Sequence, residues 1–131
     1  MQILRLDHAT INTSDLDATL AFYDHFLGLI PGWRPGLAIE GAWLYPRGGD
    51  YPILHVIVRD REPSGGMFDH IAFRSVGLAS YLEKVKASGA QYNAMPVDET
   101  NLVQVQHRDP NQVLVEVNFE GEAIDPLDVR R

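Results

Sequence analysis

The chain has 131 residues, of which 45% are hydrophobic, and this is enough for one domain with its own buried core. Its net charge of −7 excludes nucleic acid and anionic membranes as main partners, because clustered Lys and Arg are what chiefly hold both. It has no cysteine, so disulfides and thiolate metal sites are excluded, and any metal must be held by nitrogen and oxygen.

The first half of the chain, residues 1–61, predicts a strand, a helix and three further strands. Residues 3–11 suit a buried strand, and the helix that follows can be capped by Ser14 and ended by Gly28 in a left-handed conformation. The three strands are expected at Leu37–Ile39, Ala42–Tyr45 and Tyr51–Val58, with Gly and Pro residues between them. No long apolar segment or leader pattern occurs, so we expect a cytoplasmic protein without a membrane association.

The second half, residues 67–119, predicts the same order of elements. It follows a linker at Arg59–Gly66 that is rich in charge, Gly, Pro and Ser. We expect a strand, a helix stopped by Gly89, and three strands, at Phe68–Arg74, Leu78–Ser88, Gln91–Ala94, Leu102–Arg108 and Val113–Phe119. Residues 120–131 are expected to form a polar tail.

The two halves also repeat individual residues. Asp7-His8 returns as Asp69-His70 with an offset of 62 residues, and His55 returns as Glu116 with an offset of 61. This pattern predicts an α+β fold in a single domain over 1–131. Two βαβββ modules would form a curved, cup-shaped sheet of eight strands with the helices outside.

Alternation along the strands predicts that the candidate ligands share one face. Val115 and Val117 belong to the aliphatic face of the last strand, which leaves Glu116 on the opposite face. His55 and His70 likewise fall opposite the helix-covered face of their strands, whereas the assignment of His8 depends mainly on the repeat. His8, His55, His70 and Glu116 can then converge on one divalent metal per chain.

Glu116 also has a simpler interpretation. A carboxylate within an apolar strand is costly to bury without a cationic partner, and Arg74 could supply a salt bridge instead of a metal. Further side chains are expected to line a substrate pocket. They are Phe68, Trp43, Tyr45, Ile57, Arg74 and Gln106.

These segments resemble the vicinal oxygen chelate superfamily, which includes glyoxalases, bleomycin-resistance proteins and extradiol dioxygenases. The resemblance covers nearly the whole chain, through Asp7-His8, Phe22–Leu29, Asp69–Phe73 and Asp109–Val117. It implies paired βαβββ modules around a divalent metal that chelates vicinal oxygens of a small molecule. By the resemblance, His8, His70 and Glu116 are the metal ligands, and Gln112 stands where the family usually has a turn Gly.

His55 separates the branches of that family. The resemblance to ring-cleaving dioxygenases makes His55 an acid or base near bound oxygen, with Fe(II) as the favoured metal, although Gln106 stands where those enzymes commonly carry a tyrosine. The alternative is a glyoxalase I-like lyase or isomerase with Ni, Zn or Mn, in which His55 is a fourth ligand. A metal-free drug-binding or resistance protein is the third possibility. A homodimer, or an equivalent pairing within one chain, is expected, because one βαβββ half leaves its open sheet face and two of the four ligand positions unpaired.

Overall fold

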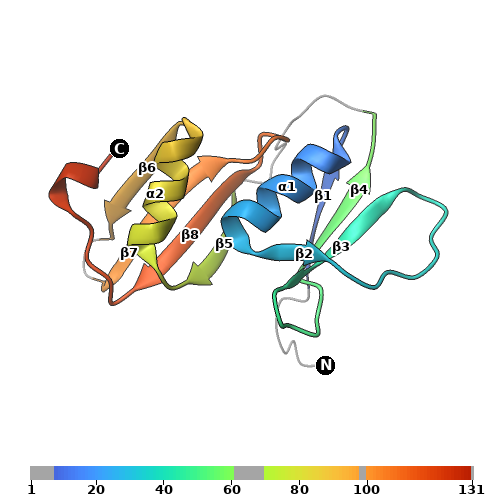
Figure 1. The fold of residues 1–131 in the computed structure, drawn as a ribbon, viewed down its shortest axis with the longest axis horizontal. Coiled ribbons are helices and arrows are strands. Elements are labelled where there is room, and N and C mark those ends of the chain that lie inside the picture. Colours follow the sequence, from blue (N-terminus) through green and yellow to red (C-terminus); the bar gives the residue numbers. More distant parts are fainter. Residues whose placement is uncertain (1–7, 61–69, 98–99, 131) are drawn as a thin grey trace, which may run out of the picture. The chain divides into compact units, whose positions relative to one another are not determined.

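The computed structural model describes residues 8–60, 70–97 and 100–130, and it divides the chain into two compact units, Met1–Pro63 and Ser64–Arg131. Each unit contains the predicted order of one strand, one helix and three strands (Figure 1). The first unit has β1 (Ala9–Thr13), α1 (Leu16–Leu27), β2 (Leu29–Pro31), β3 (Gly41–Pro46) and β4 (Leu54–Val58). The second has β5 (His70–Ser75), α2 (Leu78–Ser88), β6 (Tyr92–Pro96), β7 (Leu102–Arg108) and β8 (Leu114–Glu120), followed by the short 3-10 helix η1 (Pro126–Asp128).

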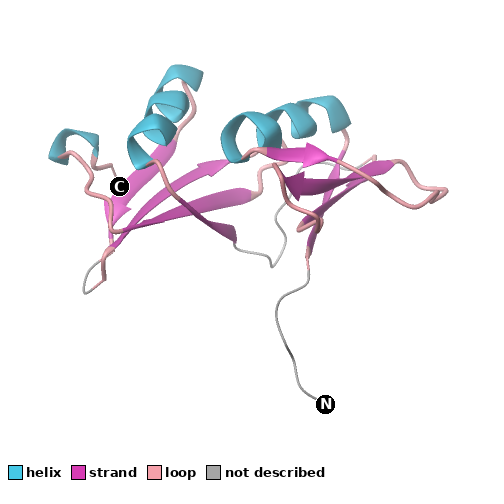
Figure 2. Ribbon diagram, turned by 60° about the horizontal axis from the view of Figure 1, so that its bottom comes forward, coloured by secondary structure: helices cyan, strands magenta, loops and turns pink. Residues whose placement is uncertain are grey.

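The two units have the same strand topology. Their sheets are ordered β1-β4-β3-β2 and β5-β8-β7-β6. The first strand of each unit pairs in parallel with the fourth, and the other pairs are antiparallel. Each helix lies on one face of the sheet of its own unit (Figure 2). The α+β class and the repeat are therefore confirmed, with the eight strands present as two mixed four-stranded sheets.

The core of each unit lies between its helix and the covered face of its sheet. In the first unit Leu44, Leu54 and Val56 of the sheet are buried together with Tyr23 of α1. In the second unit the apolar side of β8, Val115, Val117 and Phe119, is fully buried, as alternation along this strand predicts. The opposite side of each sheet is not covered by the helix of its unit and carries the candidate site residues.

The helix α1 begins one residue later than the expected cap at Ser14 implies. Asp15 is the N-cap, and its carboxylate accepts a hydrogen bond from the Ala18 backbone N–H at 2.9 Å. Thr13 fixes this start, because its hydroxyl accepts a hydrogen bond from the Asp15 N–H at 2.9 Å. The predicted stop is confirmed, since Gly28 ends the helix at φ +62.

The second strand of the first unit does not lie at Leu37–Ile39, so this prediction was wrong. β2 instead follows Gly28 directly, and Leu29 is buried opposite Pro46 of β3. Pro31 is tolerated there because β2 is an edge strand. Leu37 is half exposed, and the Pro35-Gly36 pair before it interrupts any ladder.

Residues after β8, predicted as a tail, are attached to the second unit. The backbones of Ala94 and Arg130 exchange two hydrogen bonds of 2.9 and 2.8 Å. The Glu122 carboxylate accepts hydrogen bonds from the N–H groups of Gly77 and Leu78 at 2.7 and 2.8 Å. It thereby caps α2, whose own N-cap residue, Gly77, has no side chain to do so. Among the described residues, no helix is long and apolar enough to cross a membrane.

Gln112 lies in the left-handed region, at φ +66, in the turn between β7 and β8. A non-glycine residue costs roughly 1–2 kcal/mol in this conformation, whereas glycine adopts it freely but loses more backbone entropy on folding. The Asp109 carboxylate holds the turn by accepting the N–H groups of Asn111 and Val113 at 2.8 Å each. The turn therefore keeps its hydrogen bonds whatever side chain stands at position 112.

We expect Gln112→Gly to raise the free energy of unfolding by about 0.5–1 kcal/mol, because the relief of strain exceeds the added entropy cost. Thermal or urea denaturation measures this. The matched control is Gly48→Ala, which places a side chain at φ +76 in open space and should destabilise by a similar amount. A lower melting temperature for Gln112→Gly would contradict the strain at this turn.

Candidate metal centre

The strands β1 and β4 bring two histidines together in the first unit. Thr10 pairs with His55, so His8, two residues before Thr10, falls on the same side of the sheet. The rings of His8 and His55 are stacked, with centroids 3.8 Å apart and an interplanar angle of 23°. This contact agrees with the prediction, made mainly from the repeat, that His8 and His55 share one face of the sheet.

Trp43 covers the other side of the His55 ring. The two residues are partners in the β3–β4 ladder, and their rings are parallel within 2° at a centroid distance of 4.3 Å. Trp33 meets Trp43 edge to face at 6.1 Å, and the Tyr45 hydroxyl donates to the Trp33 carbonyl at 2.8 Å. The open face of the first unit is thus largely aromatic and apolar around the two histidines.

In the second unit, the carboxylate of Glu116 lies beside His70. β5 and β8 are parallel neighbours, with Ala72 paired to Glu116, which puts His70 on the same side of the sheet. His70 Nε2 is 4.0 Å from Glu116 Oε2. Glu116 is 5% exposed, whereas the side chain of His70 is 39% exposed. The buried carboxylate therefore has an accessible histidine at its side.

Three amide groups donate hydrogen bonds to Glu116. Gln104 Nε2 and Asn118 Nδ2 donate to Oε1 at 2.9 and 2.8 Å. Gln106 Nε2 donates to Oε2 at 2.7 Å. These donors offset the cost of burying the negative charge without a cation in direct contact.

Gln104 and Asn118 were not among the predicted site residues. The signal for them is the period of two along the strands, since Gln104 precedes Gln106 by two residues and Asn118 follows Glu116 by two. Gln106, expected in the pocket, contacts Glu116 directly because the two are ladder partners.

Arg74 does not neutralise Glu116. Its Nη1 donates to Glu120 Oε2 at 2.7 Å, on the exposed end of β8. The salt bridge between Arg74 and Glu116, considered from the sequence, is therefore wrong. Arg74 shares the face of Glu116 by register, but it stands opposite Asn118, and its partner Glu120 lies two residues beyond Asn118.

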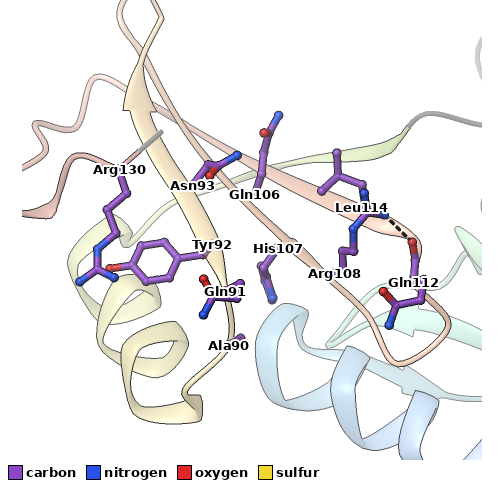
Figure 3. Close-up of a pocket in the computed structure, with 10 residues that line it drawn as sticks. All are labelled: Ala90, Gln91, Tyr92, Asn93, Gln106, His107, Arg108, Gln112, Leu114 and Arg130. Atoms are coloured by element: carbon purple, nitrogen blue, oxygen red, sulfur yellow. Dashed lines mark hydrogen bonds between the residues drawn. The ribbon is translucent and has the colours of Figure 1, made fainter.

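A polar pocket of about 840 Å³ lies in the second unit at the edge formed by β6 and the end of β7 (Figure 3). Its lining contains two arginines and four side-chain amides but no carboxylate. The lining residues are Ala90, Gln91, Tyr92, Asn93, Gln106, His107, Arg108, Gln112, Leu114 and Arg130. Gln106 joins this pocket to Glu116, because the same side chain lines the pocket and donates to the carboxylate. Of the side chains predicted for a substrate pocket that lie in the described ranges, only Gln106 belongs to this lining.

His107 is buried beside the turn between β7 and β8. Its ring is 2% exposed, and Nε2 forms a hydrogen bond of 2.7 Å with the Tyr81 hydroxyl. Burial lowers the pKa of His107 to about 4 and raises the pKa of Tyr81 above its usual value of 10. Both groups are therefore neutral near pH 7.

The lowered pKa of His107 predicts a loss of stability in mild acid. Below pH 6.5 the unfolded state binds a proton at this histidine that the folded state rejects until about pH 4. The free energy of unfolding should fall by roughly 2–3 kcal/mol across this interval from this group alone. Urea denaturation at several pH values measures this change. In the His107→Leu variant, the free energy of unfolding should depend less on pH than in the parent protein. Equal slopes for the two proteins would contradict the assignment.

The candidate ligands thus occur as two pairs, one in each unit. Within the described ranges, no three His, Asp or Glu side chains form a single cluster that could hold a metal. His8 and His55 form the pair of the first unit, and His70 and Glu116 form that of the second. Phe68, predicted for the pocket, falls outside the described residues.

The chain thus contains two similar βαβββ units, with a pair of histidines on the uncovered face of the first sheet and a histidine and a carboxylate on that of the second. The chain belongs to the Glyoxalase/Bleomycin resistance protein/Dioxygenase superfamily, whose family model matches residues 5–117. This membership confirms the resemblance that the sequence motifs indicated.

Similar proteins include a curated relative and several solved structures with the same fold. A curated relative, Glyoxylase I 4 of Arabidopsis thaliana, is 26% identical over 135 residues, which cover 97% of this chain and 78% of the relative. A mutant of the fosfomycin resistance protein FosX from Listeria monocytogenes, complexed with Mn(II) and 1S,2S-dihydroxypropylphosphonic acid, superposes with a TM-score of 0.73 at 19% identity. This match covers 91% of this chain and 94% of FosX. A glyoxylase/bleomycin resistance protein/dioxygenase domain from Frankia sp. EAN1pec gives a TM-score of 0.72 at 15% identity, covering 91% and 99% of the two chains.

Proposed function

We propose that this protein is a divalent-metal-dependent enzyme acting on a small molecule with two adjacent oxygens. The proposed metal ligands are His8, His70 and Glu116. The observation that carries the proposal is the environment of the Glu116 carboxylate. A carboxylate that is buried, oriented by three amides and 4.0 Å from a histidine nitrogen is prepared to bind a cation.

The donor set suits a metal ion of the first transition row. Two imidazoles and one carboxylate form a facial triad that accommodates Fe(II), the metal favoured from the sequence, and also Mn, Ni or Zn. When bound, such an ion would supply electrophilic stabilisation of negative charge on the substrate oxygens. Proton transfer and contacts with the rest of the substrate are assigned to side chains of the protein.

The relatives support lyase or isomerase chemistry over ring cleavage. One is named a glyoxylase, and another was crystallised with Mn(II) and a phosphonic acid that carries hydroxyls on neighbouring carbons. We therefore place glyoxalase-like chemistry first, whereas the sequence alone favoured an extradiol-type dioxygenase. Ring cleavage remains the second candidate, since a histidine at position 55, ahead of the ligand position His70, and the set of two histidines and one carboxylate are what favoured it.

His55 is the proposed acid or base. Imidazole exchanges protons near neutral pH, and this ring is held between His8 and Trp43 so that its plane is fixed. Trp43, Tyr45 and Ile57 are proposed to contact apolar parts of the substrate. Gln106 is proposed to contact polar parts, through the pocket that it lines.

The test begins with the metal content of protein purified without oxygen. About one divalent ion per chain supports an enzyme of this kind, whereas protein that binds none from Fe(II), Mn, Ni or Zn would be a metal-free binding protein. The loaded protein is then assayed with catechols and with the glutathione hemithioacetal of methylglyoxal. Oxygen consumption with catechols supports the dioxygenase, and anaerobic turnover of the hemithioacetal supports the lyase.

The proposed assembly is a homodimer. Each four-stranded sheet has one face covered by its helix, and its other face carries the candidate ligands. Closing that face requires a second module, from the same chain or from another copy. Sedimentation equilibrium should give about twice the mass of the 14.7 kDa chain, and a monomer that binds metal would contradict the dimer alone.

A further inference from the structure

The hydrogen bonds to Glu116 are distributed unevenly between its two oxygens. Oε1 accepts two, from Gln104 and Asn118, and Oε2 accepts one, from Gln106. Because a carboxylate only accepts, each amide must turn its nitrogen toward Glu116, and this fixes the orientation of all three side chains.

An ionised carboxylate has about four lone-pair positions, two on each oxygen. The two positions of Oε1 are occupied by amide hydrogens, and one position of Oε2 is occupied as well. Among the residues that the structure describes, no further donor reaches Glu116, so one acceptor position is left, on the oxygen that lies 4.0 Å from His70 Nε2. The hydrogen bonds therefore leave a single place for a cation, next to a second potential ligand.

We propose that Gln104, Gln106 and Asn118 are positioning residues that make Glu116 a monodentate metal ligand through Oε2 alone. The inference rests on the proposed metal site and adds to it the coordination mode and the residues that impose it. Chelation through both oxygens would require the cation to displace the hydrogens of Gln104 and Asn118 from Oε1, and rotating the buried carboxylate would break the same hydrogen bonds. A monodentate carboxylate leaves more of the coordination sphere open to a substrate with two oxygens.

The test uses the full chain and Mn(II) as the probe. Gln104→Met and Asn118→Leu, alone and together, remove the donors to Oε1 with little change in volume, and Gln106→Met removes the donor to Oε2. The matched control is Asn93→Leu on the same face, because Asn93 is the β6 partner of Gln106 and, in the described part of the chain, its amide does not bond to Glu116.

Two measurements separate positioning from packing. Titration with Mn(II), followed by the electron paramagnetic resonance of the free ion, should show at least about a ten-fold loss of affinity in the double variant and little change in the control. A crystal structure of the Mn(II)-loaded parent should show Glu116 bound through one oxygen. In the double variant, the freed Oε1 should approach the metal. Each single variant at Gln104 or Asn118 keeps one donor on Oε1, so its loss of Mn(II) affinity should be smaller than that of the double variant. These variants provide the test if the double variant does not fold.

The outcomes are distinguishable. A parent that binds no Mn(II) or other divalent ion would overturn the proposed function and this assignment with it. A parent that binds Mn(II) with both oxygens of Glu116 would overturn the assignment alone. Variants with the affinity of the parent would do the same.

Discussion

The double variant His70→Ala, Glu116→Ala is expected to lose the metal, with an affinity reduced by more than about 100-fold. Disturbing the residues around metal ligands already costs 10- to 100-fold, so removing two of the ligands themselves should cost more. Elemental analysis of protein purified without oxygen, followed by titration with Mn(II) or Fe(II), measures the effect. Metal retained at full stoichiometry would remove both residues from the site.

A matched control removes the same residue types elsewhere. His25 is exposed on α1, and Glu120 is exposed at the end of β8, where it pairs with Arg74. His25→Ala, Glu120→Ala should keep the metal. Since Glu116→Ala leaves three amide donors without their acceptor, Glu116→Gln is a second variant, and it should lose metal with a smaller effect on melting temperature.

The second large effect is expected at His55. His55→Gln should keep the metal and lower turnover by about 10²- to 10⁴-fold, because an amide fills the space and forms hydrogen bonds but does not act as an acid or base near neutral pH. The measurement is kcat together with metal content in the same preparation. A fall in metal affinity of roughly ten-fold or more would instead make His55 a ligand.

A second variant separates the chemistry of the ring from its packing. His55→Phe keeps an aromatic ring between His8 and Trp43 but has no nitrogen. If stacking is the role of His55, this variant should retain activity. If proton transfer is the role, it should be as slow as His55→Gln. Unchanged metal content and unchanged activity in both variants would leave His55 as a packing residue.

The sequence predicted the faces of His55, His70 and Glu116 because alternation along a strand is a strict geometric rule, whereas the face of His8 was predicted mainly from the repeat. Glu116 lies opposite Val115 and Val117, and His55 lies opposite Leu54 and Val56, as this rule requires. The helix α2 has the bounds that the sequence predicted, Leu78–Ser88, because apolar spacing marks its extent and Gly89 marks its end.

Features that depend on contacts between strands were not predictable in the same way. β2 was missed because three residues give no measurable period, and its position follows from the reversal at Gly28 and the burial of Leu29. The donors Gln104 and Asn118 were missed because the sequence does not give the β7–β8 register that brings them to Glu116. The alternative of a salt bridge from Arg74 to Glu116 could not be rejected from the sequence either, because it does not give the β5–β8 register, which places Arg74 opposite Asn118 and nearer to Glu120.

The shared register of the two sheets has a consequence for how this chain can diversify. Trp43 is the ladder partner of His55, and Gln106 is the ladder partner of Glu116, so an indole and an amide occupy corresponding places in the two copies of the unit. Both places face away from the helix-covered core, so the side chain at either place can differ without altering the apolar packing between helix and sheet. The same strand topology therefore carries a stack of rings in the first unit and a set of amides in the second.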